Sequence, residues 1–231
     1  MVSKKLLNPA VIVHHRSLLK ARGQVWHKKD KLKGIESKKP FDKEGNWGYS
    51  EAKDEWIYGY GIHLSVIATP KNPVFPLFSE LTSANQKDLR VLEQNLFKIP
   101  EETEHLVADR EYDCQRIYQK SKGRLVIPIR ETKNWKTKKR TMSEKRRKRK
   151  EFFKSQEGQK LYRLRNSTVE QLFNVIKNIF KVEPSWFFGK AYVETLVLTA
   201  VWTYQIFVAY SFYHDLPVRR IQKIKPFLDR L

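Results

Sequence analysis

The sequence is poor in cysteine, because Cys114 is the only one among 231 residues. An internal disulfide and a cysteine-based zinc cluster are therefore excluded, and a reducing cytoplasm is the expected compartment. The chain also lacks a glycine-rich phosphate loop, a Ser-His-Asp order and histidines at metal-ligand spacing. No signal peptide is expected, because the apolar run at residues 10–13 is short and ends in two histidines.

Acidic residues are few relative to basic ones. Asp plus Glu number 25 against 46 Lys plus Arg, which gives a net charge of 46 − 25 = +21 at pH 7. This imbalance indicates a polyanionic partner, nucleic acid before a membrane surface. At 40% apolar residues the chain can bury a core and is not disordered. We expect a single domain over residues 1–231, with its core at about 10–130 and 160–215 and a basic insertion at about 131–159.

Short β-branched runs alternate with helical patterns along the first 130 or so residues. Strands are expected at 10–17, 56–68, 74–81, 105–109 and 124–129, and Pro128 indicates that the last strand lies at an edge. Helices are expected at 86–97 and 112–122, and residues 18–48 are expected to form a loop. The order predicts an α/β fold in which helices flank a mixed parallel and antiparallel sheet, the order of the ribonuclease-H-like fold.

The stretch from Tyr162 to Lys177, YRLRNSTVEQLFNVIK, has an amphipathic helical pattern. Its apolar residues recur at spacings of three and four, and Glu170 and Lys177 lie on the polar stripe beside them. Ser167 or Asn166 would cap the start of this helix. The segment from Ser167 to Glu170 also fits a capping box, in which Glu170 only closes the helix N-terminus.

The spacing of four residues in this helix resembles the Tyr-Arg-Glu-Lys signature of bacterial insertion-sequence transposases of the DDE type. The four are Tyr162, Arg165, Glu170 and Lys177. Four residues separate Arg from Glu here, where the family usually has three, so Arg163 competes with Arg165 for the Arg position. The resemblance implies that Glu170 is the third metal-binding acid. It also implies that Arg165 and Lys177 hold the DNA backbone near the scissile phosphate, while Tyr162 bonds a phosphate oxygen or packs.

Asp109 ends a short apolar run, at the place where open α/β sheets position ligand groups. The segment VADREYD resembles the second catalytic motif of the same family, an Asp followed by a Tyr-Asp pair, here Tyr112 and Asp113. The resemblance implies that Asp109 is catalytic and binds the metal. The alternative role, a helix cap, suits Asp113 better, because Asp113 directly precedes the helix expected to begin at Cys114.

The first acid of the family lies on the opening strand, in a pattern like Asp-x-Thr/Ser, and His15 fills that place in IVHHRSLL. The resemblance covers about residues 11–215. It implies a cage for Mg²⁺ (or Mn²⁺), which would activate the attacking oxygen and stabilise the leaving one. Imidazole suits zinc, nickel or copper and not Mg²⁺, so His15 predicts a copy with little or no activity. If His15 is not at the first position, the candidates become Asp30, Asp42 and Asp54.

The segment from Lys133 to Lys154 holds twelve Lys or Arg against two Glu. This density is too high for a packed element, so a solvated basic insertion before the Glu170 helix is expected. The positive charges of this segment would repel one another unless a polyanion were bound to them. We therefore expect the segment to contact DNA. Its candidate DNA-binding residues are Lys139, Arg140, Arg146 and Arg147.

Residues 191–213 carry one charge, Glu194, and the stretch is long enough to span a membrane. Threonine and glutamine dilute its apolar character, and the rest of the chain has an α/β pattern. A buried helix that packs on the domain is therefore expected, and no membrane partner.

The resemblance implies a transposase, a polynucleotidyl transferase that cuts and joins DNA in the recombination of an insertion sequence. Its expected partners are transposon ends, target DNA and a second copy of the chain, in the bacterial cytoplasm. Family members usually carry an N-terminal DNA-binding region, so a truncated copy is expected. The alternative is a non-catalytic nucleic-acid-binding remnant, which His15 favours and the pair Asp109 and Glu170 disfavours. A membrane-associated basic protein is a third hypothesis, which requires the α/β pattern to be accidental.

Overall fold

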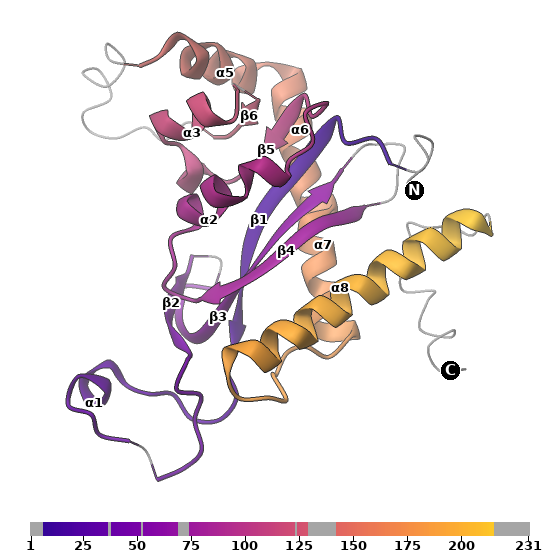
Figure 1. Ribbon diagram of the computed structural model, residues 1–231. Coiled ribbons are helices and arrows are strands. Elements are labelled where there is room, and N and C mark those ends of the chain that lie inside the picture. The colour runs from indigo at the N-terminus through magenta and orange to yellow at the C-terminus, as the bar shows by residue number, and fades with distance from the viewer. Residues whose placement is uncertain are drawn as a thin grey trace. The chain divides into compact units, whose positions relative to one another are not determined.

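The computed structural model describes residues 7–36, 38–51, 53–68, 74–122, 124–128 and 142–214. The chain contains both strands and helices, which are interspersed in the sequence in the manner of an α/β protein (Figure 1). The strands are β1 (Val11–Lys20), β2 (Asn46–Ser50), β3 (Glu55–Ile67), β4 (Phe75–Ser83), β5 (His105–Val107) and β6 (Leu125–Val126). The helices are α1 (Lys28–Leu32), α2 (Asp88–Asn95), α3 (Gln115–Lys120), α5 (Glu144–Lys154), α6 (Gln156–Ser167), α7 (Val169–Asn174) and α8 (Lys190–Tyr213).

The described strands form one mixed sheet with the order β2-β3-β1-β5-β6, and β4 also pairs with β3. Strand β1 runs parallel to β5, β5 runs parallel to β6, and β2 is antiparallel to β3. The predicted α/β class, a mixed sheet flanked by helices that is compatible with a ribonuclease-H-like fold, is confirmed. The edge position predicted from Pro128 is also confirmed, because β6 ends the order of the described strands.

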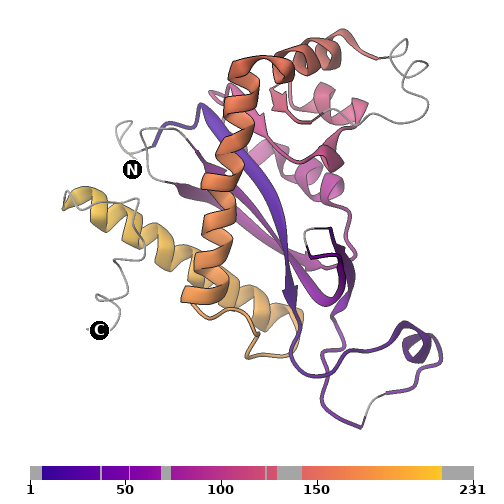
Figure 2. The ribbon, with the colours of Figure 1, turned by 180° about the vertical axis from the view of Figure 1, so that it is seen from behind.

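The chain divides into two compact units. The first comprises residues 1–15, 64–78 and 87–171. Its core is a cluster of buried residues from β1, α2, β5, α3 and β6, which includes Ile12, Leu92, Leu106, Ile117 and Leu125. Helices α5 and α6 follow one another with a turn at Ser155, whose extended backbone (φ −68°, ψ 160°) ends α5 (Figure 2). This unit holds both acids that the sequence assigns to catalysis.

The second unit comprises residues 16–63, 79–86 and 172–231. It holds β2, which pairs with β3 where the sequence analysis expected a loop. That prediction was wrong because β2 has little alternation of its own and its stability comes from tertiary contacts. Gly48 in β2 lies so close to Ala84 that a Cβ would meet its carbonyl oxygen at 2.5 Å. Gly59 in β3 also makes a close backbone approach, because a Cβ there would lie 2.1 Å from the Leu19 carbonyl oxygen.

Helix α8 has one buried face and one exposed face, both largely apolar. The buried face includes Val193, Val197, Val201, Tyr204 and Val208. Five large side chains are exposed on the other: Tyr192, Trp202, Ile206, Tyr210 and Tyr213. The helix is therefore buried along one face only, where the sequence predicted a buried helix that packs on the domain. Among the described residues it alone is long and apolar enough to cross a membrane, with 33% of its most apolar window buried.

Candidate active site

Asp109 lies two residues beyond β5, immediately before a 3₁₀ turn at Arg110–Tyr112. Its backbone is extended (φ −77°, ψ 166°), and its Oδ1 accepts a hydrogen bond from the Arg110 backbone N–H at 2.5 Å. Asp109 therefore caps this turn with one carboxylate oxygen and has the other, Oδ2, available for a further contact. The side chain is 30% exposed, so the carboxylate is accessible from solvent.

Arg165 joins Asp109 to Glu170. The Arg165 Nη1 donates to Asp109 Oδ2 at 2.8 Å, and the Arg165 Nε lies 3.4 Å from Glu170 Oε1. The guanidinium also lies over the ring of Tyr162, 5.1 Å from its centroid. Three residues of the Tyr-Arg-Glu-Lys pattern thus meet the second-motif acid in one cluster. The two acids, which the resemblance assigns to one metal cage, converge on a single guanidinium, and their catalytic roles stay a prediction.

The Arg–Glu spacing of this chain is accommodated by a break in the helix. In an unbroken α-helix a separation of five residues turns two side chains about 140° apart, whereas a separation of four keeps them on one face. Helix α6 ends at Ser167, Thr168 leaves the helical region (φ −126°, ψ −85°), and α7 begins at Val169. Arg165 and Glu170 can therefore meet despite the extra residue.

Two details of the predicted helix were wrong. The helical pattern is interrupted at Thr168, and neither Asn166 nor Ser167 caps a helix start, because both lie in the last turn of α6. The Ser167 hydroxyl donates to the Leu164 carbonyl instead. Of the two arginines that compete for the Arg position, Arg165 contacts both acids while Arg163 is exposed, and the DNA-binding role of either stays a prediction.

Burial raises the pKa of the Tyr162 hydroxyl, and the charge of Arg165 opposes part of that shift. The Asp109 and Glu170 carboxylates raise the pKa of Tyr162 further. A tyrosine with a raised pKa stays protonated at neutral pH. Tyr162 is therefore a neutral packing partner for the guanidinium, one of the two roles the sequence left open.

His15 lies in β1 at the position expected for the first acid. Strands β1 and β5 are parallel, with Val13 opposite Val107. His15 and Asp109 each follow this pair by two residues, so the register, continued, places them as neighbours on the same face. His14 points to the opposite face, where it is buried, lies 2.8 Å from the Ser65 hydroxyl and meets the ring edge of Tyr112.

The residues of this cluster do not fit a divalent ion as they stand. No group of three His, Cys, Asp or Glu side chains that could hold a metal occurs in the part of the chain that the structure describes. A guanidinium bridges the Asp109 and Glu170 carboxylates, and His15, the residue predicted at the first position, would offer imidazole nitrogen instead of the oxygen that Mg²⁺ prefers.

Lys177 does not take part in this cluster. It lies in a π-helical turn at Val175–Ile179 in the second unit, and its side chain is 12% exposed. Its ammonium donates to the Leu18 carbonyl and lies 3.3 Å from the Glu183 carboxylate. Burial lowers the pKa of Lys177, which the Glu183 charge partly opposes. The ammonium thus links this turn to β1, which differs from the solvent-facing phosphate contact that the sequence predicted.

The three other candidate acids have local roles. The buried Asp42 accepts from the backbone N–H groups of Gly189 and Glu44, at 2.9 and 3.0 Å. Asp54 lies in a left-handed turn (φ 52°) and accepts from the Tyr49 hydroxyl. Asp30 lies in the short helix α1. All three belong to the second unit, whereas Asp109 and Glu170 belong to the first.

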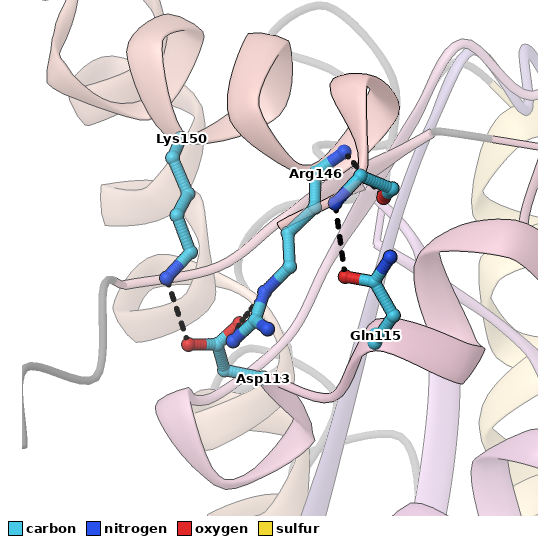
Figure 3. Close-up of polar contacts among 5 residues, drawn as sticks. Asp113, Gln115, Arg146 and Lys150 are labelled. Carbon is cyan, nitrogen blue, oxygen red and sulfur yellow. Dashed lines mark hydrogen bonds and ion pairs between the residues drawn. The ribbon is translucent and has the colours of Figure 1, made fainter. Parts of the chain in front are cut away.

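The basic segment is partly a packed helix, which corrects the prediction of a solvated insertion. Helix α5 begins after Ser143, whose side chain caps it, and its Arg146 and Lys150 both reach the carboxylate of Asp113 (Figure 3). Arg146 donates to Oδ1 at 2.8 and 3.0 Å, and Lys150 donates to Oδ2 at 3.1 Å. Asp113 is 0% exposed at its side chain, so one buried acid stabilises two cations of the helix.

The N-terminal helix cap, an alternative role that the sequence favoured for Asp113 over Asp109, is not what Asp113 provides. The residue before α3 is Cys114, and the Asp113 carboxylate is directed to α5 instead. Gln115 supports the same junction, because its side-chain oxygen accepts from the Ser143 backbone N–H at 3.3 Å. The signal that could have located α5 is the four-residue spacing of Arg146 and Lys150, which places both on one helix face.

The candidate DNA-binding residues of this segment have different environments. The Arg146 guanidinium is bound to Asp113, with its side chain 15% exposed, so it is directed inward. Arg147 is exposed on α5 and can meet a phosphate. Lys139 and Arg140 lie outside the described residues.

One family model matches most of the chain. It is described as the transposase DDE domain, and the match covers residues 12–206. No curated protein and no solved structure gives a significant match.

Proposed function

This chain belongs to the transposase DDE-domain family, and we propose that it binds DNA as a transposase domain whose catalytic centre lacks its first acid. The family assigns it a role in transposition and the reaction class of a polynucleotidyl transferase. The observation that carries the proposal is the convergence of Asp109 and Glu170 on Arg165, with His15 and Asp109 each two residues beyond the paired Val13 and Val107.

DDE transposases generally use divalent metals. In this family role, Mg²⁺ or Mn²⁺ would be held by carboxylate oxygens and would supply the charge that activates one oxygen and stabilises another. Two carboxylates and one imidazole supply one negative charge fewer than three carboxylates. The natural chain is therefore proposed to bind transposon DNA without cleaving it in Mg²⁺.

DNA binding is supported by charge. The net charge of +21 favours a polyanion over any neutral partner. Lys145, Arg147 and Lys148 are exposed on α5, whose inner cations are already bound to Asp113. These exposed side chains can exchange water for phosphate oxygens without breaking the contacts that hold the helix.

Restoring the first acid tests the catalytic part of this proposal. His15→Asp is expected to raise Mg²⁺ or Mn²⁺ affinity, measured by calorimetry, because it adds an oxygen ligand and a negative charge beside Asp109. Nicking of supercoiled DNA that carries the element's ends is expected to rise from background in the same variant.

The matched control is His15→Asp combined with Glu170→Gln, which keeps the new acid and removes an old one. This double variant is expected to show the ion affinity and the nicking of the unaltered chain, without the increase expected for His15→Asp alone. Full Mg²⁺-dependent nicking by the unaltered chain would refute the proposal that His15 disables the centre. Failure of His15→Asp to gain ion affinity would show that residue 15 is not at the first ligand position.

A further inference from the structure

A hollow in the second unit is formed by one curled segment of the chain between β1 and β2. The hollow has a volume of about 450 Å³ and is lined by Gly23 to His27, Asp30, Ile35 and Glu36, which we call the loop pocket. Its volume is within the range of sites for small ligands, and its lining combines an indole ring with two carboxylates. None of these residues belongs to the cluster of Asp109, Arg165 and Glu170.

Contacts within the same unit hold the Trp26 ring in place. The Trp26 indole N–H donates to the Ile35 carbonyl at 2.9 Å, and the Phe41 ring lies 5.1 Å from it. The Trp26 carbonyl accepts from the Trp47 indole N–H at 3.1 Å. An aromatic ring fixed in this way loses little conformational freedom when a second flat ring stacks on it.

The backbone at the mouth of the loop pocket is also fixed. Gly23 has φ +83°, and a Cβ there would lie 2.3 Å from the Pro40 carbonyl oxygen. The Gln24 backbone N–H donates to the same Pro40 carbonyl at 3.1 Å. Only glycine fits this approach, so the two ends of the curled segment are held together at residues 23 and 40.

The charges around the loop pocket select an anionic ligand that carries hydrogen-bond donors. The same curled segment carries exposed lysines at positions 28, 29 and 33 and the half-buried Lys31, and the exposed Lys43 lies shortly after it in the chain. Glu36 is paired with Lys43 at 2.7 Å, whereas Asp30 has no ion pair or side-chain hydrogen bond to any described residue. The pocket therefore offers an aromatic face and one carboxylate acceptor inside a basic rim.

We propose that the loop pocket binds one unpaired nucleobase of DNA, stacked on Trp26, with the Asp30 carboxylate accepting from an exocyclic amino group of the base. The lysines of the rim hold the adjacent phosphates. A stacked base pair cannot enter a pocket built from a single loop, so the base must come from a single strand, a bulge or an end. This inference rests on the DNA binding proposed above and adds a site and a base preference to it.

A simple cation is the competing ligand, since tryptophan and carboxylates also attract cations. Lys31 already supplies one, because its Nζ lies 5.3 Å from the Trp26 ring centroid. Stacking of a base contributes more than an exposed cation–π contact, so the base displaces Lys31, whose ammonium moves to a phosphate. The lysine-rich rim further disfavours a free cation.

The proposal predicts a base preference that electrostatics alone cannot give. Cytosine presents an exocyclic amino donor, and thymine presents a carbonyl oxygen at the same position. Single-stranded dC and dT homopolymers of equal length carry equal numbers of phosphates, so any difference between them comes from the bases. The full chain is expected to bind labelled dC about tenfold more tightly than dT in fluorescence anisotropy.

Three variants test the assignment. Asp30→Ala removes the acceptor but none of the loop contacts, and is expected to bring dC binding to the level of dT. Trp26→Leu is expected to weaken both homopolymers. Trp56→Leu removes a tryptophan that is 64% exposed in the same unit but does not line the pocket, and is expected to change neither.

Several outcomes would overturn the inference. Equal affinity of the unaltered chain for dC and dT, with salt-dependent binding of duplex DNA retained, would overturn the loop pocket alone. Absence of any DNA binding by the unaltered chain would overturn both the proposed function and this inference. A saturable change in tryptophan fluorescence with tetramethylammonium, absent in Trp26→Leu and absent with sodium, would show that the pocket binds a cation.

Discussion

Arg165 neutralises two carboxylates that would otherwise repel one another. Asp109 and Glu170 are 30% and 42% exposed, so water screens part of their repulsion, but both contact the same guanidinium. The positive charge of the shared arginine attracts both carboxylates and offsets their mutual repulsion. An ion that binds both acids must therefore displace Arg165 from at least one of them.

His14 gives the chain a stability that depends on pH. Burial lowers its pKa to about 3, with the charge of His15 as the smaller cause, while an unfolded histidine has a pKa near 6.5. Between these values the unfolded state binds a proton that the folded state excludes, so stability falls as pH drops below about 6.5. At pH 5 the loss attributable to His14 is expected to be about 2 kcal/mol.

Urea unfolding between pH 7 and pH 5 measures this effect. His14→Gln removes the titrating group, so its free energy of unfolding is expected to fall less over this range than that of the unaltered chain. His27→Gln, a change at an exposed histidine, serves as the control and is expected to follow the unaltered chain. The same pH dependence in all three proteins would show that His14 is not the group responsible.

At the scale of elements, one buried carboxylate holds helix α5. Asp113 is 0% exposed and Lys150 is 5% exposed, so removing the acid leaves a buried cation without its partner. Asp113→Asn is therefore expected to lower the free energy of unfolding by about 3 kcal/mol. The control is Glu144→Gln, which breaks the exposed pair with Lys148 on the same helix and is expected to change the free energy of unfolding far less than Asp113→Asn does, because water screens that pair.

A further variant separates charge from packing at this junction. Asp113→Leu combined with Arg146→Met and Lys150→Met replaces the ion cluster by apolar side chains and is expected to recover part of the stability lost in Asp113→Asn. Chemical unfolding, followed by the helical circular dichroism signal, measures the stability of Asp113→Asn and of the triple variant. A loss below about 0.5 kcal/mol in Asp113→Asn would show that the buried contacts do not stabilise α5.

The sequence predicted those elements whose pattern is set by their own residues. Strands β1 and β3 have continuous apolar runs, and both were found near their predicted bounds. Strand β2 and helix α5 were missed because tertiary contacts stabilise them, Gly48 against Ala84 and Asp113 against Arg146 and Lys150. The residue pattern within a short segment carries no information about a contact with a residue more than thirty positions away in the chain.

The candidate site, like the secondary structure, was predicted from the sequence only in part. Motif spacing identified Asp109, Arg165 and Glu170, which the structure brings together. Spacing could not show that Lys177 is bound to Glu183, because that contact depends on the π-helical turn and the loop that follows it. Nor could it show the break at Thr168, which compensates for the extra residue between Arg165 and Glu170.

At the scale of the whole molecule, the net charge of +21 makes DNA affinity depend on salt. Each phosphate that a Lys or Arg neutralises releases condensed counterion, so the logarithm of affinity for duplex DNA falls linearly with the logarithm of salt concentration, by about 0.9 per contact. Lys145→Gln combined with Arg147→Gln removes two exposed charges from α5 and is expected to reduce this slope by about 1.8.

A second double variant, with the same change in net charge at another helix, separates the effect of the position of these charges from the effect of their number. Lys87→Gln combined with Arg90→Gln lowers the net charge by the same two units at exposed residues at the start of α2 and is expected to leave the slope nearly unchanged. Lys139→Gln combined with Arg140→Gln extends the test to the other predicted DNA contacts. Equal slopes in the α5 and α2 variants would mean that DNA responds to the overall charge of the molecule, and the basic helix would then have no special part in binding.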